Sequence, residues 1–253
     1  MNLPQDDLLH YVLRLADTPL ILAQRLGAWC GHAPELEIDL ALSNIALDLL
    51  GQARNFYQYA AGLAGPGWDE DRFAFQRDES AFSNLLLAEQ PNGGFNDTLV
   101  RQFLLDAWHH CLYRQLSLSR DASLAAIAAK ALKEVTYHLR FSSGWMIRLG
   151  DGTLQSHDRM QQALNGLWRF TAEPFLSDAT EQRLVQQGIA PDAAALQAAW
   201  HTLTAPVLQA ATLTPPTEAA WRHGGKQGQH SEHFGYLLAE MQFLPRSQPG
   251  CRW

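Results

Sequence analysis

The stretch KEVTYHLRF (residues 133–141) lies in the middle of a long helical pattern and places Glu134 four residues before His138. Four-helix proteins with a carboxylate-bridged di-iron centre carry a Glu-x-x-His pair, at spacing i, i+3, on each of two helices. The position where that Glu would stand is occupied by Val135. The stretch therefore predicts a helical bundle whose metal site either has a shifted ligand or has lost one.

Apolar residues recur at helical spacing along almost the whole chain, without a long alternating strand pattern. Long helices are predicted at about 5–28, 36–64, 96–119 and 122–149. Shorter helices are predicted at about 155–173, 178–187, 192–212 and 231–244. Two short connections and one crossover of roughly 30 residues are typical of a ferritin-like fold. We therefore predict an all-α protein, a ferritin-like four-helix bundle with additional C-terminal helices.

The predicted domain organisation is a single ferritin-like helical domain over residues 1–253. Its bundle core covers about 5–149, and a helical extension covers about 150–253. The crossover should contain a short helix of its own around DESAFSNLLLAEQ (78–90). Pro19 lies inside the first predicted helix and should kink or divide it.

Composition narrows the function classes. Hydrophobic residues make up 47% of the chain and charged residues 18%, which allows a large core and argues against disorder. A net charge of −7 without a basic block excludes nucleic acid and membranes as expected partners. Cys30, Cys111 and Cys251 have no Cys-x-x-Cys spacing, which fits a reducing cytosol better than a disulfide framework. The start MNLPQDDLLH has no basic region, so a secretory signal is not expected. No apolar run is long enough to span a membrane. We therefore expect a soluble, cytoplasmic protein.

A helical wheel places the candidate ligands of the fourth long helix. At 100° per residue, Glu134 lies about 40° to one side of His138 and Val135 about 60° to the other, so Glu134 and His138 should face the core. The spacing i, i+4 does not itself exclude a metal, because zinc proteases use it. The predicted inward line consists of Ile127, Ala131, His138, Trp145 and Leu149.

The third long helix, DTLVRQFLLDAWHHCLYRQL (97–116), is apolar almost all round and should be the most buried element. A lone carboxylate there, Asp106, needs a partner, because an unpaired buried charge is costly. His109, His110 or a basic side chain of a neighbouring helix could supply it.

The other two long helices weaken the metal hypothesis. The inward i, i+3 pair of the second helix is Leu49 and Gln52, neither of which is a useful iron ligand. From Leu8 to Gly31, the first helix has Asp17 as its only acid. Because a di-iron centre needs about four carboxylates and two imidazoles, the predicted site is depleted.

Two polar motifs lie near the C-terminus. HSEH (230–233) could bind a metal, but an ordinary helix start with Ser231 as N-cap is favoured. GGKQG (224–228) lacks the P-loop pattern and follows no strand. A flexible basic loop that contacts a partner or a phosphate remains an alternative for this motif.

Four segments carry a specific resemblance that covers nearly the whole chain: RLGAWCGHAPELEIDLALSNIALDLLGQARNFYQYA, FSNLLLAEQPNGGFNDTLVRQFLLDAWH, KALKEVTYHLRFSSGW and GQHSEHFGYLLAEMQ. They resemble the C-subunit family of the bacterial phenylacetyl-CoA 1,2-epoxidases, the ring-oxygenating monooxygenases of aerobic phenylacetate degradation. The resemblance implies a ferritin-like protein that pairs with a related catalytic A subunit, which holds the di-iron centre and binds the CoA thioester. The implied system is completed by a reductase, with flavin and an iron–sulfur cluster, and by a small B subunit.

The resemblance also implies what happened to the metal ligands. The catalytic subunit's Asp-Glu-Ala-Gly-His run corresponds to DLLGQ here, in which Leu49 and Gln52 replace the ligand Glu and His. Its Lys-Glu-Glu-Ser-Phe-His run corresponds to KEVTYH, in which Val135 replaces a Glu and His138 is kept, and Asp106 matches a ligand Asp. The implied vestigial di-iron positions are Leu49, Gln52, Asp106, Val135 and His138.

Three functional hypotheses follow. The preferred one is a structural subunit without catalytic residues, metal or other cofactor, which stabilises the di-iron catalytic subunit. A stand-alone CoA-thioester-binding protein that uses Arg222 and Lys226 for the phosphates is a weaker alternative. The rival from another class is an autonomous di-iron or di-manganese oxidase, whose ligands would be Asp106, His109, Glu134 and His138.

Overall fold

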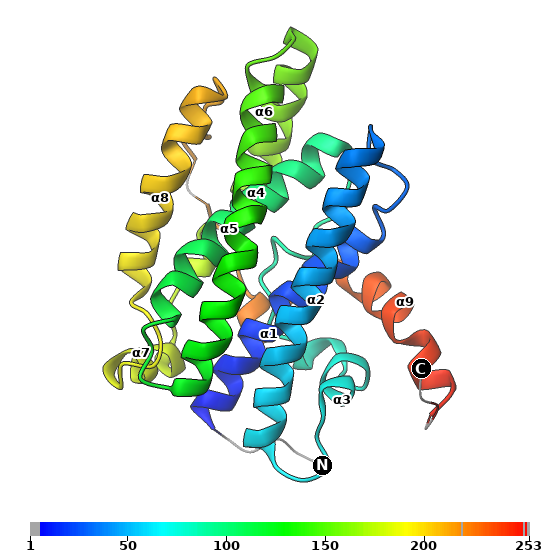
Figure 1. The fold of residues 1–253 in the computed structure, drawn as a ribbon, viewed down its shortest axis with the longest axis vertical. Coiled ribbons are helices and arrows are strands. Elements are labelled where there is room, and N and C mark those ends of the chain that lie inside the picture. Colours follow the sequence, from blue (N-terminus) through cyan, green and yellow to red (C-terminus); the bar gives the residue numbers. More distant parts are fainter. Residues whose placement is uncertain (1–5, 219, 250, 252–253) are drawn as a thin grey trace. The chain divides into compact units, whose positions relative to one another are not determined.

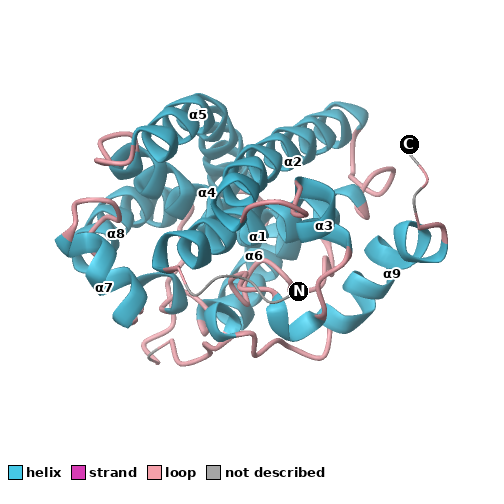
Figure 2. Cartoon of the chain, turned by 90° about the horizontal axis from the view of Figure 1, so that it is seen from below, coloured by secondary structure: helices cyan, strands magenta, loops and turns pink. Residues whose placement is uncertain are grey.

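The structure, a computed structural model, describes residues 6–218, 220–249 and 251, and all regular elements in this part of the chain are helices (Figure 2). The all-α prediction is confirmed. The chain divides into two compact units, which are described separately. The N-terminal unit combines residues up to 91 with residues from 224 onward, and the central unit comprises residues 92–223.

The N-terminal unit is built on a long helical hairpin (Figure 1). Its elements are α1 (Asp7–Gly27), α2 (Leu36–Ala64), α3 (Glu70–Phe75), the 3-10 turns η1 (Glu79–Ala81) and η3 (Gly225–Gln227), and α9 (Phe234–Ser247). Helix α1 begins after Asp6, whose side chain accepts a hydrogen bond from the Leu8 amide. It continues through Pro19, so the predicted division is wrong. Buried side chains on both sides of Pro19 hold the helix by packing.

The crossover after α2 differs from the prediction. The short helix lies earlier, at α3, where the Asp69 side chain accepts from the Arg72 amide at 2.7 Å, and the stretch 78–90 forms only η1 and turns. Polar side chains of α1 replace helical hydrogen bonds there. The Ser83 amide donates to Asp17 at 2.7 Å, and the Leu85 amide donates to the Thr18 hydroxyl at 3.2 Å.

The central unit is built on a second long hairpin, in which α4 packs against α5 and also contacts α6 and α8. Its elements are α4 (Phe95–Leu116), α5 (Ala122–Gly150), α6 (Leu154–Trp168), the 3-10 turn η2 (Glu173–Phe175), α7 (Ala179–Gln186) and α8 (Ala193–Ala210). Helix α4 is buried on all sides, as its pattern predicted. The Trp200 indole of α8 donates to the Leu104 carbonyl of α4 at 3.1 Å. The end of α5 lies so close to the end of α8 that a Cβ atom on Gly150 would be 2.3 Å from the Ala211 carbonyl oxygen.

The residues predicted to form one C-terminal extension divide between the two units. Residues 150–223 belong to the central unit with α4 and α5, whereas α9 packs against α3 and η1 in the N-terminal unit. The single domain over 1–253 stays a prediction. Residues 1–5, which include the first residue of the helix predicted at 5–28 and half of the MNLPQDDLLH start, lie outside the described residues.

Across the described residues, none of the helices combines the length and the apolar character needed to cross a membrane.

Candidate functional site

The inner face of α5 is displaced from the predicted line. Val135 lies within the buried row, Glu134 is half-buried at its edge, and Trp145 is only partly covered. The helical wheel gave the spacing of the buried residues correctly. The direction in which the buried face of α5 points depends on the helices that pack against it, which are α4, α6 and α8. The buried residues of α5 are Leu124, Ala128, Ala131, Val135, His138, Ser142, Met146 and Gly150.

Asp106 of α4 is fully buried and is held by neutral side chains. The Gln102 amide donates to Oδ1 at 2.6 Å, and the Ser142 hydroxyl of α5 donates to Oδ2 at 2.8 Å. The prediction that a histidine or a basic residue pairs with Asp106 is wrong. Burial raises the pKa of Asp106 to about 8, although both hydrogen bonds oppose the shift. At neutral pH this carboxyl is therefore mostly protonated.

His109, one turn after Asp106, is a neutral imidazole in the core. Burial and, second, the charge of the nearby His138 lower the pKa of His109 to about 3. Its ring stacks on Tyr113 at 5.3 Å between centroids, and no described residue offers a hydrogen bond to either ring nitrogen. The pKa of Tyr113 is raised, first by burial and second by the charge of Glu134. These side chains form a packed, mostly neutral group in the central unit.

The remaining vestigial positions, Leu49 and Gln52, lie on α2 in the N-terminal unit, and both are buried. The structure therefore places Asp106, His109 and His138 on the packed helices α4 and α5 of the central unit, with Val135 buried at the position where the resemblance implies a ligand Glu.

The donor set does not fit a di-iron centre. Among the described residues, no three His, Cys, Asp or Glu side chains are grouped so that they could hold a metal ion. Hard divalent cations need several anionic oxygens, and here the buried carboxyl is neutral at pH 7. The four ligands of the rival oxidase hypothesis reduce to one neutral acid, two buried imidazoles and the half-buried Glu134.

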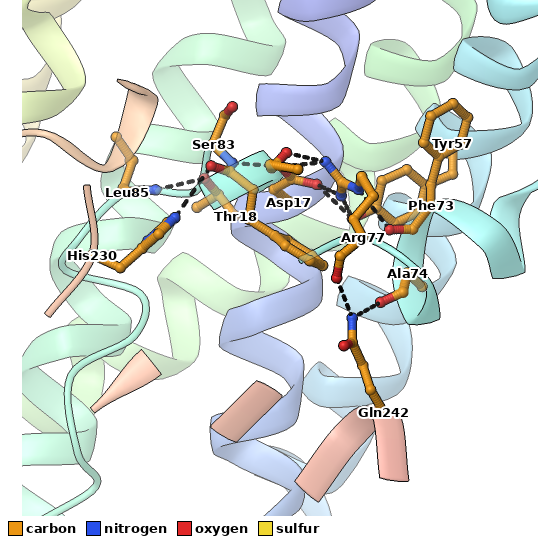
Figure 3. A network of polar contacts seen from close by, with 12 residues as sticks. Asp17, Thr18, Tyr57, Phe73, Ala74, Arg77, Ser83, Leu85, His230 and Gln242 are labelled. Atoms are coloured by element: carbon orange, nitrogen blue, oxygen red, sulfur yellow. Dashed lines mark hydrogen bonds and ion pairs between the residues drawn. The ribbon is translucent and has the colours of Figure 1, made fainter. Parts of the chain in front are cut away.

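A buried ion pair that the sequence did not reveal lies in the N-terminal unit (Figure 3). Arg77 binds the Asp17 carboxylate with both terminal nitrogens, one of them at 3.1 Å, and the Tyr57 hydroxyl donates to the same carboxylate at 2.6 Å. The Gln242 amide of α9 donates to the Arg77 carbonyl at 3.0 Å. The network thereby ties α1, α2, the crossover and α9 together. Its sequence signal is Asp17, an acid inside a run of otherwise uncharged residues, 15–23, in α1.

Arg77 also lies among aromatic rings. Its guanidinium is 4.0 Å from the centroid of Phe82, and its Nε donates to the Phe73 carbonyl at 2.7 Å. The guanidinium nitrogens of Arg77 donate to the Phe73 carbonyl, the Asp17 carboxylate and the Ala81 carbonyl. The network therefore has a structural role.

The GGKQG motif is not a flexible loop. It forms η3, and the Lys226 side chain is only 9% exposed. A Cβ atom on Gly228 would lie 2.3 Å from the Ser80 carbonyl oxygen, so the turn packs directly on η1. Arg222 belongs to the central unit and Lys226 to the N-terminal unit, and nearly all of Lys226 is covered. These facts give no support to a phosphate site built from this pair.

The HSEH motif also differs from the prediction. Helix α9 begins at Phe234 without a side-chain cap, and Ser231 instead donates its backbone N–H to Glu89 at 2.6 Å. His230 contacts Glu89 as well, at 2.9 Å. The motif therefore anchors the chain to the crossover, and Ser231 is not an N-cap.

Two long helical hairpins, one in each unit, define an all-α class of protein. The chain belongs to the family described as phenylacetic acid catabolic protein, whose sequence model matches residues 2–253. It is 60% identical over 248 residues to the C subunit of 1,2-phenylacetyl-CoA epoxidase from Escherichia coli (strain K12), and the match covers 98% of this chain and 100% of that protein. Among solved structures, it is similar to a protein from Synechococcus described as having aldehyde deformylating oxidase activity, with 18% identity, 85% and 88% coverage of the two chains and a TM-score of 0.49.

Proposed function

We propose that this chain is the C subunit of a phenylacetyl-CoA 1,2-epoxidase and that it acts as a non-catalytic structural subunit. Its 60% identity over the full length of a protein with that name supports membership in such a complex. The observation that supports the non-catalytic role is that packed hydrocarbon side chains occupy positions where the resemblance implies metal ligands. Leu49 and Val135 are fully buried hydrocarbon side chains at two positions of ligand carboxylates, and Asp106 is engaged by Gln102 and Ser142.

The proposed assignment places the cofactors elsewhere in the complex. A di-iron centre belongs to the catalytic A subunit, and flavin and an iron–sulfur cluster belong to the reductase. The assembly, which acts in the cytoplasm, also contains a small B subunit. This chain supplies no ligand, because a cation placed beside neutral Asp106 and buried Val135 would lose its hydration without gaining anionic oxygens.

Exposed leucines on α2 support a role in association. Leu36, Leu40 and Leu47 follow one line along the helix and are 70%, 54% and 64% exposed. Single exposed apolar residues are common, but an aligned set marks an interface with another protein. In the N-terminal unit, α9 adds exposed aromatic side chains at Tyr236 and Phe243.

Co-expression with the catalytic subunit tests the association. We expect one stable hetero-oligomer and a more soluble catalytic subunit than in its absence. The double variant Leu40→Asp/Leu47→Asp should weaken the complex, whereas Gln197→Asp/Ala205→Asp, at exposed positions of α8, serves as a charge-matched control. Separate elution of the two wild-type subunits at micromolar concentration would refute the structural-partner role.

Elemental analysis tests the absence of a metal centre in this chain. After expression in iron-supplemented medium, the wild type should contain less than about 0.1 equivalent of iron or manganese. Val135→Glu should change little, because one added carboxylate does not supply the several anionic oxygens that a hard divalent cation needs. A full di-iron stoichiometry in the wild type, with an oxo-bridge absorption band, would restore the autonomous oxidase hypothesis.

A further inference from the structure

His230 lies at the start of the C-terminal segment, which we define as residues 224–247, and both of its ring nitrogens face acceptors. Nδ1 is 2.9 Å from the Glu89 carboxylate, and Nε2 is 3.2 Å from the Phe82 carbonyl oxygen. The side chains of His230 and Glu89 are both inaccessible to solvent. A neutral imidazole donates from one nitrogen only, so it can bond to both groups only if Glu89 is protonated and donates to Nδ1.

Glu89 fixes the direction of the hydrogen bonds. The Asn84 amide donates to its Oε2 at 3.0 Å, and the Ser231 amide donates to its Oε1 at 2.6 Å. Both donors are N–H groups, which cannot accept a hydrogen bond, so they favour the ionised carboxylate, which then accepts from its third neighbour, Nδ1 of His230. The Phe82 carbonyl can only accept, so Nε2 also carries a proton. The contacts therefore assign an imidazolium to His230.

Other charged groups around the pair favour the same state. Glu89 and Glu79 of η1 both raise the pKa of His230, against the lowering effect of burial, and the net direction is upward. Arg25 of α1 donates from Nε to the Glu89 backbone carbonyl at 3.0 Å, and its guanidinium lies near the charge of the Glu89 carboxylate. The ring of Phe234 stacks on the imidazole at 4.1 Å between centroids and shields it from water.

The pair joins two parts of the N-terminal unit that are distant in sequence. Glu89 ends the crossover, and His230 lies between η3 and α9. Arg25 reaches the same junction from α1, where it contacts the backbone carbonyls of Glu89 and His233. Loss of the imidazolium proton would place an unprotonated ring nitrogen against a carboxylate or carbonyl oxygen, and this repulsion would act directly on the attachment of α9.

We propose that the buried His230–Glu89 pair is a pH-sensitive latch that fastens the C-terminal segment to the crossover while His230 is protonated and loosens it at alkaline pH. This device is independent of the proposed role in an epoxidase complex. The unfolded pKa of a histidine is about 6.5. Because the folded pKa is raised, the latch contributes its full stability below that value and loses it as pH rises through the folded pKa.

Hydrogen exchange of the full chain between pH 6 and 9 tests the latch. After correction for the intrinsic exchange rate, protection of peptides from the C-terminal segment should fall by up to about tenfold per pH unit above pH 6.5, until the folded pKa is passed. Peptides from α5 should show the same pH dependence in the wild type and in His230→Gln, because the proton on Asp106 is common to both proteins. His230→Gln should lower the protection of the segment and remove its pH dependence, and the exposed His201→Gln should behave as wild type.

Nitrogen chemical shifts of the His230 ring in the wild-type chain provide a measurement that needs no variant to fold, since His230→Gln serves only for assignment. Shifts of a doubly protonated ring at pH 6.5 and of a neutral ring only at higher pH support the latch. A neutral ring at pH 6.5, or protection of the segment that does not change with pH, would overturn it.

Discussion

Replacing Asp106 by asparagine isolates the energetic consequence of burying a carboxyl among neutral partners. Asparagine has nearly the same shape, can accept from Gln102 and can donate to the Ser142 hydroxyl, so both contacts of the wild type have counterparts. It cannot ionise. The folded pKa of Asp106 is about 8, whereas an unfolded aspartate has a pKa of about 3.9. Between these values the folded chain holds a proton that the unfolded chain has released.

The sign of the pH effect follows from that proton. Because the folded state binds more protons, the free energy of unfolding of the wild type falls as pH rises, by about 1.4 kcal/mol per pH unit. Between pH 5 and pH 7 the wild type should therefore lose about 2.7 kcal/mol relative to Asp106→Asn. Buried histidines such as His109 have the opposite pH dependence, but they are present in both proteins and cancel in the difference.

Urea unfolding of wild type and variant at pH 5, 6, 7 and 8 measures this difference. We expect similar stability at pH 5 and a growing advantage of the variant up to pH 8. The exposed Asp151→Asn serves as a control whose difference from wild type should not change with pH. If Asp106→Asn is destabilised by a constant amount at all pH values, or loses ground as pH rises, then Asp106 is ionised in the fold and the reasoning is wrong.

Three further substitutions test other parts of the structure. Arg77→Ala should lower the free energy of unfolding by about 3–5 kcal/mol, because it leaves a buried carboxylate unpaired; the exposed Arg54→Ala should cost about 0–1 kcal/mol, and equal costs in urea unfolding would contradict the buried pair. Gly150→Ala should lower the free energy of unfolding by about 1–3 kcal/mol through overpacking. Gly144→Ala, with open space around it on the same helix, should raise it by about 0.5–1 kcal/mol in thermal or urea unfolding. An unchanged stability of Gly150→Ala would contradict the close approach to Ala211. His138→Ala should lower stability by about 1–3 kcal/mol and leave turnover of the assembled epoxidase unchanged, and turnover reduced about a hundredfold at an unchanged melting temperature would show a catalytic role.

Helices with strong periodicity were predictable from the sequence. The range 36–64 matches α2, and α5 differs from its predicted range by one residue at its end. The crossover was not predictable, because its backbone hydrogen bonds go to side chains of α1 that are far away in sequence. The start of α9 was misplaced for the same reason, since Ser231 binds Glu89 instead of capping a helix.

The candidate site shows the same division. The wheel identified Asp106 and His138 as core positions, and both are fully buried. It could not centre the buried face of α5, because that centre depends on which helices pack on each side, and so Val135 proved more buried than Glu134. The helical wheel also could not predict the partners of Asp106. Ser142 lies on another helix, and no sequence pattern marks it as a partner.

The order of the segments along the chain has a consequence for synthesis on the ribosome. The C-terminal segment completes the unit that α1 and α2 begin, and the whole of residues 92–223 is made between them. The central unit can therefore close around α4 and α5 while the first hairpin still lacks α9, Gln242 and His230. Until those residues emerge, the nascent first hairpin exposes apolar surface on α3 and the crossover. Binding of a chaperone to nascent chains should accordingly persist until α9 has emerged from the ribosome.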